Sequence, residues 1–77
     1  MTVGQKYKYI RFEQAEEINN GWYCKNKKSE AILGFVYFYN PWRQYCFYTV
    51  DGMVFNNSCL VDIVDFLSYL NTLGKKP

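Results

Sequence analysis

The sequence contains no histidine. This absence excludes Ser-His-Asp and Cys-His nucleophilic sites and histidine metal sites, because each of them depends on an imidazole. The three cysteines, Cys24, Cys46 and Cys59, form no CxxC pair and lack the close spacing of a zinc site. The five glycines are scattered and form no phosphate-binding loop. We therefore expect no catalytic residue, no metal, no cofactor and no enzymatic activity.

The sequence also lacks a large excess of positive or negative charge, and it lacks long apolar runs. The formal net charge is +2, which is too small to predict a nucleic-acid partner, and we expect the lysines to be solvated at turns and chain ends. No apolar run approaches the ~18 residues of a membrane helix, and no apolar signal segment follows Met1. An odd number of cysteines is atypical of an extracellular disulfide framework. We expect a cytoplasmic protein with reduced thiols and no membrane partner.

Aromatic residues, in contrast, are abundant and make up 21% of the chain. The 77 residues are enough for one domain, 1–77, and a domain of this size buries only about 60% of its unfolded surface. Burying a large ring stabilises a protein by roughly 1.5–3 kcal/mol, so exposed rings forfeit a sizeable share of its stability. The composition therefore favours a homo-oligomer, a macromolecular partner or a stacked ligand that covers the excess rings.

Turn signals and residue alternation predict an antiparallel meander of four or five strands. Asn20-Gly21 and Asp51-Gly52 are typical of tight turns, and Pro41 interrupts a run of β-branched and aromatic residues. The expected strands span about 6–13, 22–26, 31–39, 42–50 and 53–55.

The last segment changes its period and predicts an amphipathic helix over about 59–73. Its apolar residues recur every three or four positions: Leu60, Ile63, Phe66, Leu67, Leu70 and Leu73. One helix has one apolar stripe, so it covers one face of the sheet only. The predicted fold class is α+β, with the C-terminal helix packed on one face of the meander.

The strand expected over 31–39 is apolar on both sides. One side carries Ile32, Gly34, Val36 and Phe38, and the other carries Leu33, Phe35, Tyr37 and Tyr39. The missing side chain of Gly34 permits close approach, so we expect the helix on that side. The rings of the other side then face something other than the helix.

The stretch FYNPWRQYCFY, residues 38–48, gathers rings around Arg43. The candidate binding residues are Tyr37, Tyr39, Trp42, Arg43, Gln44 and Tyr45. Rings supply stacking faces, and a guanidinium or an amide can bind phosphate or base edges. The structural alternative places Trp42 and Tyr45 in the core and a subunit interface, and pairs Arg43 with a surface carboxylate.

Two runs carry a resemblance to a group of small uncharacterised phage and prophage proteins. They are WRQYCF at 42–47 and CLVDIVDFL at 59–67, preceded by Leu33-Gly34, and the resemblance covers roughly 22–73. It implies a phage origin and a place in the host cytosol, whereas residues 1–21 match nothing in the group. Small phage proteins of this kind resemble counter-defence factors that bind a host immune protein or sequester a nucleotide-derived signal.

We therefore expect a phage-type binding protein that works as a homo-oligomer. Its partner would be a host defence protein or a nucleotide-like small molecule. Two alternatives stay open. One is a single-stranded nucleic-acid module that uses the same sheet face, for which binding would depend steeply on salt. The other is a structural phage protein whose aromatic face makes subunit contacts only.

Overall fold

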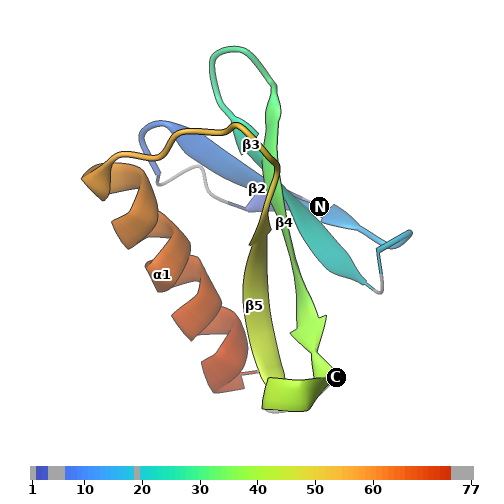
Figure 1. Cartoon of the computed structure of the whole chain (residues 1–77). Helices are drawn as coiled ribbons and strands as arrows, with labels where there is room; N and C mark the ends of the chain where they lie inside the picture. The colour runs from blue at the N-terminus through green and yellow to red at the C-terminus, as the bar shows by residue number, and fades with distance from the viewer. Residues whose placement is uncertain (1, 4–6, 19, 74–77) are drawn as a thin grey trace.

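The computed structural model describes residues 2–3, 7–18 and 20–73, and it confirms the predicted α+β fold. The sheet has five antiparallel strands in the order β1-β2-β3-β4-β5, with the helix α1 on one side (Figure 1). The elements are β1 (Thr2–Val3), β2 (Ile10–Ala15), β3 (Gly21–Asn26), β4 (Ile32–Tyr39), β5 (Gln44–Thr49) and α1 (Asn57–Leu73). Strands that are consecutive in the chain are neighbours throughout, so the sheet is a meander.

Several elements differ from the expected ones. β5 begins at Gln44 rather than at residue 42, because residues 40–42 form a short 3-10 turn, and α1 begins at Asn57 rather than at residue 59. Residues 7–9 form bends, so β2 begins at Ile10 and continues to Ala15, while residue 6 lies outside the described residues. Residues 53–55 are irregular rather than a strand, because they form no ladder with β5 or with another described strand. β1, which pairs with β2, was not expected because two residues are too few to show a period.

A β-bulge in β4 changes which side chains enter the core. Cys24 pairs with Gly34 but Lys25 pairs with Ile32, so Leu33 is an extra residue. As a result Leu33 is buried and Ile32 is exposed, which reverses the assignment expected from strict alternation.

The hydrophobic core lies between α1 and the sheet face that contains Val36, as the position of Gly34 indicated. Phe66 of α1 stacks on Phe12 of β2 with ring centroids 3.9 Å apart, and it meets the Trp22 ring edge-on at 5.2 Å. The buried core residues are Tyr7, Ile10, Phe12, Cys24, Leu33, Val36, Ile63, Phe66 and Leu70. Leu60 belongs to the predicted apolar stripe but is exposed.

Gly34 is required by β5 rather than by the helix. A Cβ atom at position 34 would lie 2.5 Å from Cζ of Phe47 and 2.5 Å from the carbonyl oxygen of Tyr48. The close approach predicted from the missing side chain is therefore made by the neighbouring strand.

A short 3-10 turn, η1 (Asn40–Trp42), joins β4 to β5. Pro41 lies at its start, where a missing N–H costs nothing, and Arg43 ends it in the left-handed region with φ 52°. The turn leaves the Trp42 side chain 67% exposed. Among the described residues, no helix combines the length and apolarity needed to cross a membrane.

Candidate functional site

The open face of the sheet is the side turned away from α1, and it carries rings on three adjacent strands. Cross-strand partners point to the same side of an antiparallel sheet. The register pairs Tyr23 with Phe35 and Phe35 with Tyr48, which places all three on the open face. Tyr37 and Tyr39 follow Phe35 on the same side of β4.

These rings contact one another in a pattern that we call the aromatic ladder: Tyr23, Phe35, Tyr37, Tyr39, Trp42 and Tyr48. Tyr37 and Tyr48 stack at 4.0 Å with an interplanar angle of 6°. Tyr39 meets Tyr48 edge-on at 6.2 Å and Trp42 edge-on at 5.1 Å. Tyr23 and Phe35 lie 5.8 Å apart. The stacked faces of Tyr37 and Tyr48 are therefore occupied inside the ladder, while Trp42 presents its ring to solvent.

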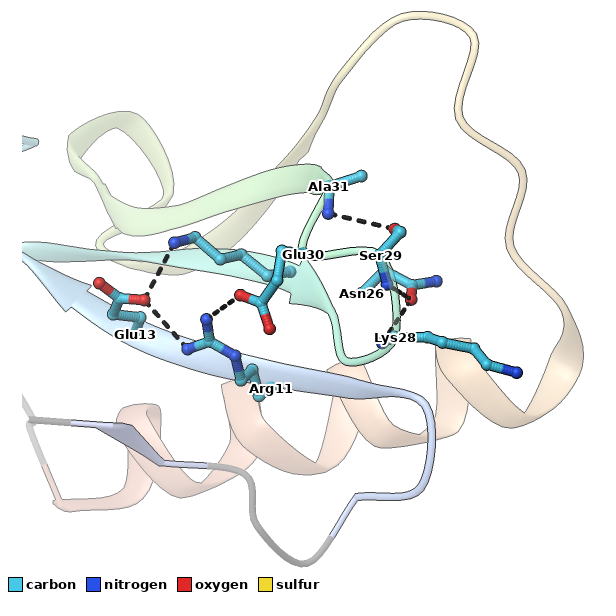
Figure 2. A network of polar contacts seen from close by, with 8 residues as sticks. Arg11, Glu13, Asn26, Lys28, Ser29, Glu30 and Ala31 are labelled. Atoms are coloured by element: carbon cyan, nitrogen blue, oxygen red, sulfur yellow. Dashed lines mark hydrogen bonds and ion pairs between the residues drawn. The ribbon is translucent and has the colours of Figure 1, made fainter.

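An ion-pair network borders the ladder on the same face, because Glu13 is the cross-strand partner of Tyr23. Figure 2 shows its contacts around Arg11, Glu13 and Glu30. Arg11 pairs with Glu13 at 3.0 Å and also with Glu30, and Lys25 pairs with Glu13 at 3.0 Å. Hydrogen bonds from Lys25 and then Arg11 hold the pKa of Glu13 below its ordinary value. Carboxylates thus compensate both cations of this half of the open face.

The Tyr48 and Tyr23 hydroxyl groups of the ladder stay protonated at neutral pH. Burial, with Tyr37 beside it, raises the pKa of Tyr48 to about 12. The Tyr23 hydroxyl donates a 2.9 Å hydrogen bond to Glu17, which raises the pKa of Tyr23. At Tyr23 and Tyr48 the open face therefore offers neutral hydroxyl groups beside its rings.

Two hollows flank Trp42. One has a volume of about 240 Å³ and is lined by Tyr39, Trp42, Cys46, Phe47 and Tyr48. The other has a volume of about 390 Å³ and lies between β5 and α1, with Trp42, Gln44 and Val64 in its lining. Trp42 lines both hollows, so a partner that covers the Trp42 ring would also contact both hollows.

The structure separates the six predicted site residues. Tyr37 and Tyr39 belong to the ladder, and Trp42 lies at one end of it. Gln44 of β5 is the cross-strand partner of Tyr39 of β4. Arg43 is exposed at the turn and forms no ion pair with another described residue, which contradicts the surface carboxylate of the structural alternative.

Tyr45 lies on the side of α1 rather than with the other candidates. Its ring meets Phe38 edge-on at 5.4 Å and packs against the core. Its backbone N–H donates to Oδ1 of Asn71 at 2.7 Å, and its carbonyl accepts from Nδ2 of Asn71 at 3.3 Å. The helix therefore holds this end of β5.

The sequence interpretation placed Phe35 on this face without naming it as a candidate, and it missed two ladder members, Tyr23 and Tyr48. Tyr48 could have been found by continuing the alternation of Gln44 along its strand. Tyr23 could not, because its place depends on the register between β3 and β4.

Thiols and acids form no metal centre in the described part of the chain. No group of three or more cysteine or acidic side chains there could hold a metal ion. Cys24, Cys46 and Cys59 are free thiols, and burial, followed by the nearby Cys59, raises the pKa of Cys24 to about 12.

Comparison with known proteins supports a phage origin. An uncharacterised 9.3 kDa protein of Acholeplasma phage L2 is 31% identical to this chain over 45 residues. The matched part covers 58% of this chain and 58% of the phage protein, so the chain spans less than two thirds of that relative. No protein-family model and no solved structure matches the chain.

Proposed function

We propose that this chain is a non-enzymatic binding protein of phage origin whose aromatic ladder holds a host protein in the host cytosol. The observation that carries the proposal is the open face, where rings on β3, β4 and β5 contact one another with α1 on the opposite side. Tyrosine, tryptophan and arginine are enriched at the energetic centres of protein interfaces. The counter-defence role, blocking a host defence protein, rests on analogy with small phage proteins.

Ring packing favours a protein partner over a stacked nucleotide at this face. Tyr37 and Tyr48 already stack on each other at 4.0 Å, so the ring faces that they turn toward each other are not open to a base. Trp42 is 67% exposed and lies next to Arg43, which forms no ion pair with another described residue, and such an arrangement is typical of an interface anchor. A flat, nearly uncharged ladder with one anchor at its end matches a protein surface.

The charges of the open face also bear on the nucleic-acid alternative. A single-stranded nucleic acid needs cations beside the stacking rings. Arg11 and Lys25, the cations of β2 and β3 on this face, are compensated by Glu13 and Glu30. This arrangement supports a protein partner more than a nucleic acid.

The proposal includes a homo-oligomer, and the exposed side of α1 supports it. Leu60, Val61 and Val64 are exposed and spaced so that they share one side of the helix. In a two-fold contact a surface meets its own copy, so a charge there would be repelled. Leu60 and Val64 form the uncharged centre of this side, whereas Asp65, one turn after Val61, lies at its border and accepts a 2.7 Å hydrogen bond from Tyr7.

Replacing Trp42 is the sharpest test of the ladder, because an exposed ring can be removed without opening the core. Tagged wild-type protein, Trp42→Ala and Val54→Ala would be produced in the host, and co-purifying proteins quantified by mass spectrometry. Val54 is 90% exposed and takes no part in the ladder, so it is the matched control. We expect one host protein that wild type and Val54→Ala retain and Trp42→Ala loses.

The purified partner then permits a direct binding measurement. Loss of an anchor residue typically costs about 2 kcal/mol or more, so Trp42→Ala should weaken binding at least about 30-fold. Thermal unfolding of each variant establishes that it is folded. Equal affinity for wild type, Trp42→Ala and Arg43→Ala would contradict the placement of the site.

Two further measurements separate the other partners. Native mass spectrometry of gently purified protein reports the stoichiometry together with any retained small molecule. A nucleotide-sized added mass that Arg43→Ala removes would favour a nucleotide-like ligand at the turn. Steep salt dependence of binding to a single-stranded oligonucleotide would favour the nucleic-acid module, since phosphate contacts release counterions.

A further inference from the structure

A third hollow lies where the segment before β2 meets the turn between β3 and β4. It has a volume of about 310 Å³ and is lined by Lys8, Tyr9, Asn26, Lys27 and Lys28. Such a volume lies at the lower end of the range for small-molecule sites. The sequence interpretation treated these lysines as solvated at turns and chain ends.

This hollow concentrates positive charge. Among the described residues its lining contains three lysines and no carboxylate, in a chain whose formal net charge is +2. Lys8 and Lys28 form no ion pair with another described residue, unlike Lys25, which pairs with Glu13. Ammonium groups that share one hollow repel one another, and a bound anion would remove that repulsion.

Hydrogen bonds hold the two segments in place. The backbone N–H of Lys27 donates to the Tyr9 carbonyl at 2.9 Å, and the Lys27 ammonium donates to the Tyr7 carbonyl. Figure 2 shows Asn26, whose Oδ1 accepts from the N–H of Lys28 at 2.8 Å and from the N–H of Ser29 at 3.0 Å. These hydrogen bonds within the chain fix the lining, which lowers the cost of ordering it on binding.

An aromatic ring completes the site. The Tyr9 side chain is 43% exposed, and Nζ of Lys8 lies 5.3 Å from its ring centroid. A ring next to ammonium groups combines a stacking surface with phosphate contacts, as nucleotide sites do.

We propose that this hollow binds a mononucleotide, with its phosphate between Lys8 and Lys28 and its base on Tyr9. The inference is independent of the proposed function, because none of these residues belongs to the aromatic ladder. Free phosphate shares the anion chemistry but cannot use the ring, so the two ligands can be told apart.

The experiment is a titration of the ¹⁵N-labelled full chain, followed by ¹H–¹⁵N correlation spectra, with AMP, inorganic phosphate and adenosine as probes. We expect AMP to shift the resonances around Lys8, Tyr9 and 26–28, and adenosine to shift them far less. Lys8→Gln with Lys28→Gln should weaken AMP binding at least about tenfold, because both phosphate contacts are lost. Tyr9→Leu should weaken AMP binding but leave phosphate binding unchanged.

Matched variants separate a site from general charge. Lys25→Gln removes one lysine outside the hollow and should leave AMP binding unchanged, whereas Lys28→Arg should retain it. The spectrum of each variant also reports its fold. The proposal is overturned if AMP shifts no resonance of the lining, if Lys25→Gln weakens binding as much as the double variant, or if Tyr9→Leu leaves AMP binding unchanged.

Discussion

The two faces of the sheet contain ring pairs of nearly the same geometry. On the covered face Phe12 and Phe66 stack at 3.9 Å with an interplanar angle of 10°, and on the open face Tyr37 and Tyr48 stack at 4.0 Å with an angle of 6°. Phe12 and Phe66 are 0% and 1% exposed, whereas both tyrosines are partly exposed. The stacking distance therefore does not distinguish a core from a binding surface. What distinguishes them is whether a second layer, here α1, covers the rings, because the hydrophobic stabilisation is proportional to the apolar area removed from water.

The cysteines of the two faces should differ most in their rates of modification. Cys24 is buried on the covered face and burial raises its pKa to about 12, whereas Cys46 is half-buried on the open face. A disulfide reagent attacks the thiolate, so Cys24 should react mainly through unfolded molecules. For a stability of about 5 kcal/mol these are about 0.02% of the population. We expect Cys46 to react at least about 100-fold faster than Cys24, measured by peptide mass spectrometry over time.

A denaturant control defines the outcome of that comparison. In concentrated urea both thiols should react at similar rates, because burial no longer separates them. Rapid modification of Cys24 in native buffer would show that the covered face opens far more readily than the packing of Phe12 and Phe66 implies.

Truncating one ring on each face should give unequal losses of stability. Phe66→Ala removes the helix ring from the core and should cost about 3–5 kcal/mol. Tyr48→Ala removes the open-face stack and should cost about 1 kcal/mol. Urea unfolding followed by circular dichroism measures both values. Equal losses would show that the open face is covered in solution, for example by a second copy of the chain.

Alkaline pH should report the burial of Tyr48 separately. Its pKa is raised from 10.0 to about 12, so above pH 10 the unfolded chain releases this proton while the folded chain retains it. The free energy of unfolding should therefore fall as pH rises from about 10 to about 12. Tyr48→Phe has no such proton and should lose less stability over this range. Identical pH slopes for wild type and Tyr48→Phe would contradict the burial of the hydroxyl.

The charged half of the open face should show the smallest effect. Glu13→Gln removes the carboxylate that pairs with Arg11 and Lys25, but exposed ion pairs contribute little to stability. Because the pKa of Glu13 is lowered in the folded state, its contribution is present at neutral pH and is lost as pH falls through that pKa. We expect a small loss at pH 7 that shrinks in high salt. A loss as large as that of Phe66→Ala would contradict this ranking.

Much of the fold was predictable because its signals are local. The helical stripe of Ile63, Phe66 and Leu70, and the turns before β3 and after β5, depend on residues close together in the chain. The candidate site was predictable in part. Tyr37, Tyr39 and Trp42 do lie together, but Tyr45 belongs to the core side, where Asn71 of α1 holds its backbone.

The sequence by itself determined that this chain is an aromatic-rich sheet followed by one amphipathic helix, because the two periods are set by neighbours along the chain. The tertiary structure alone decided three further features. The bulge at Leu33 exchanges Ile32 and Leu33 between the two faces of the sheet, and the register between β3 and β4 places Tyr23 with the ladder. The packing of two segments that are distant in the chain places Lys8 and Lys28 in the lining of one hollow. Each of these depends on contacts between residues far apart in the sequence, which no local period encodes.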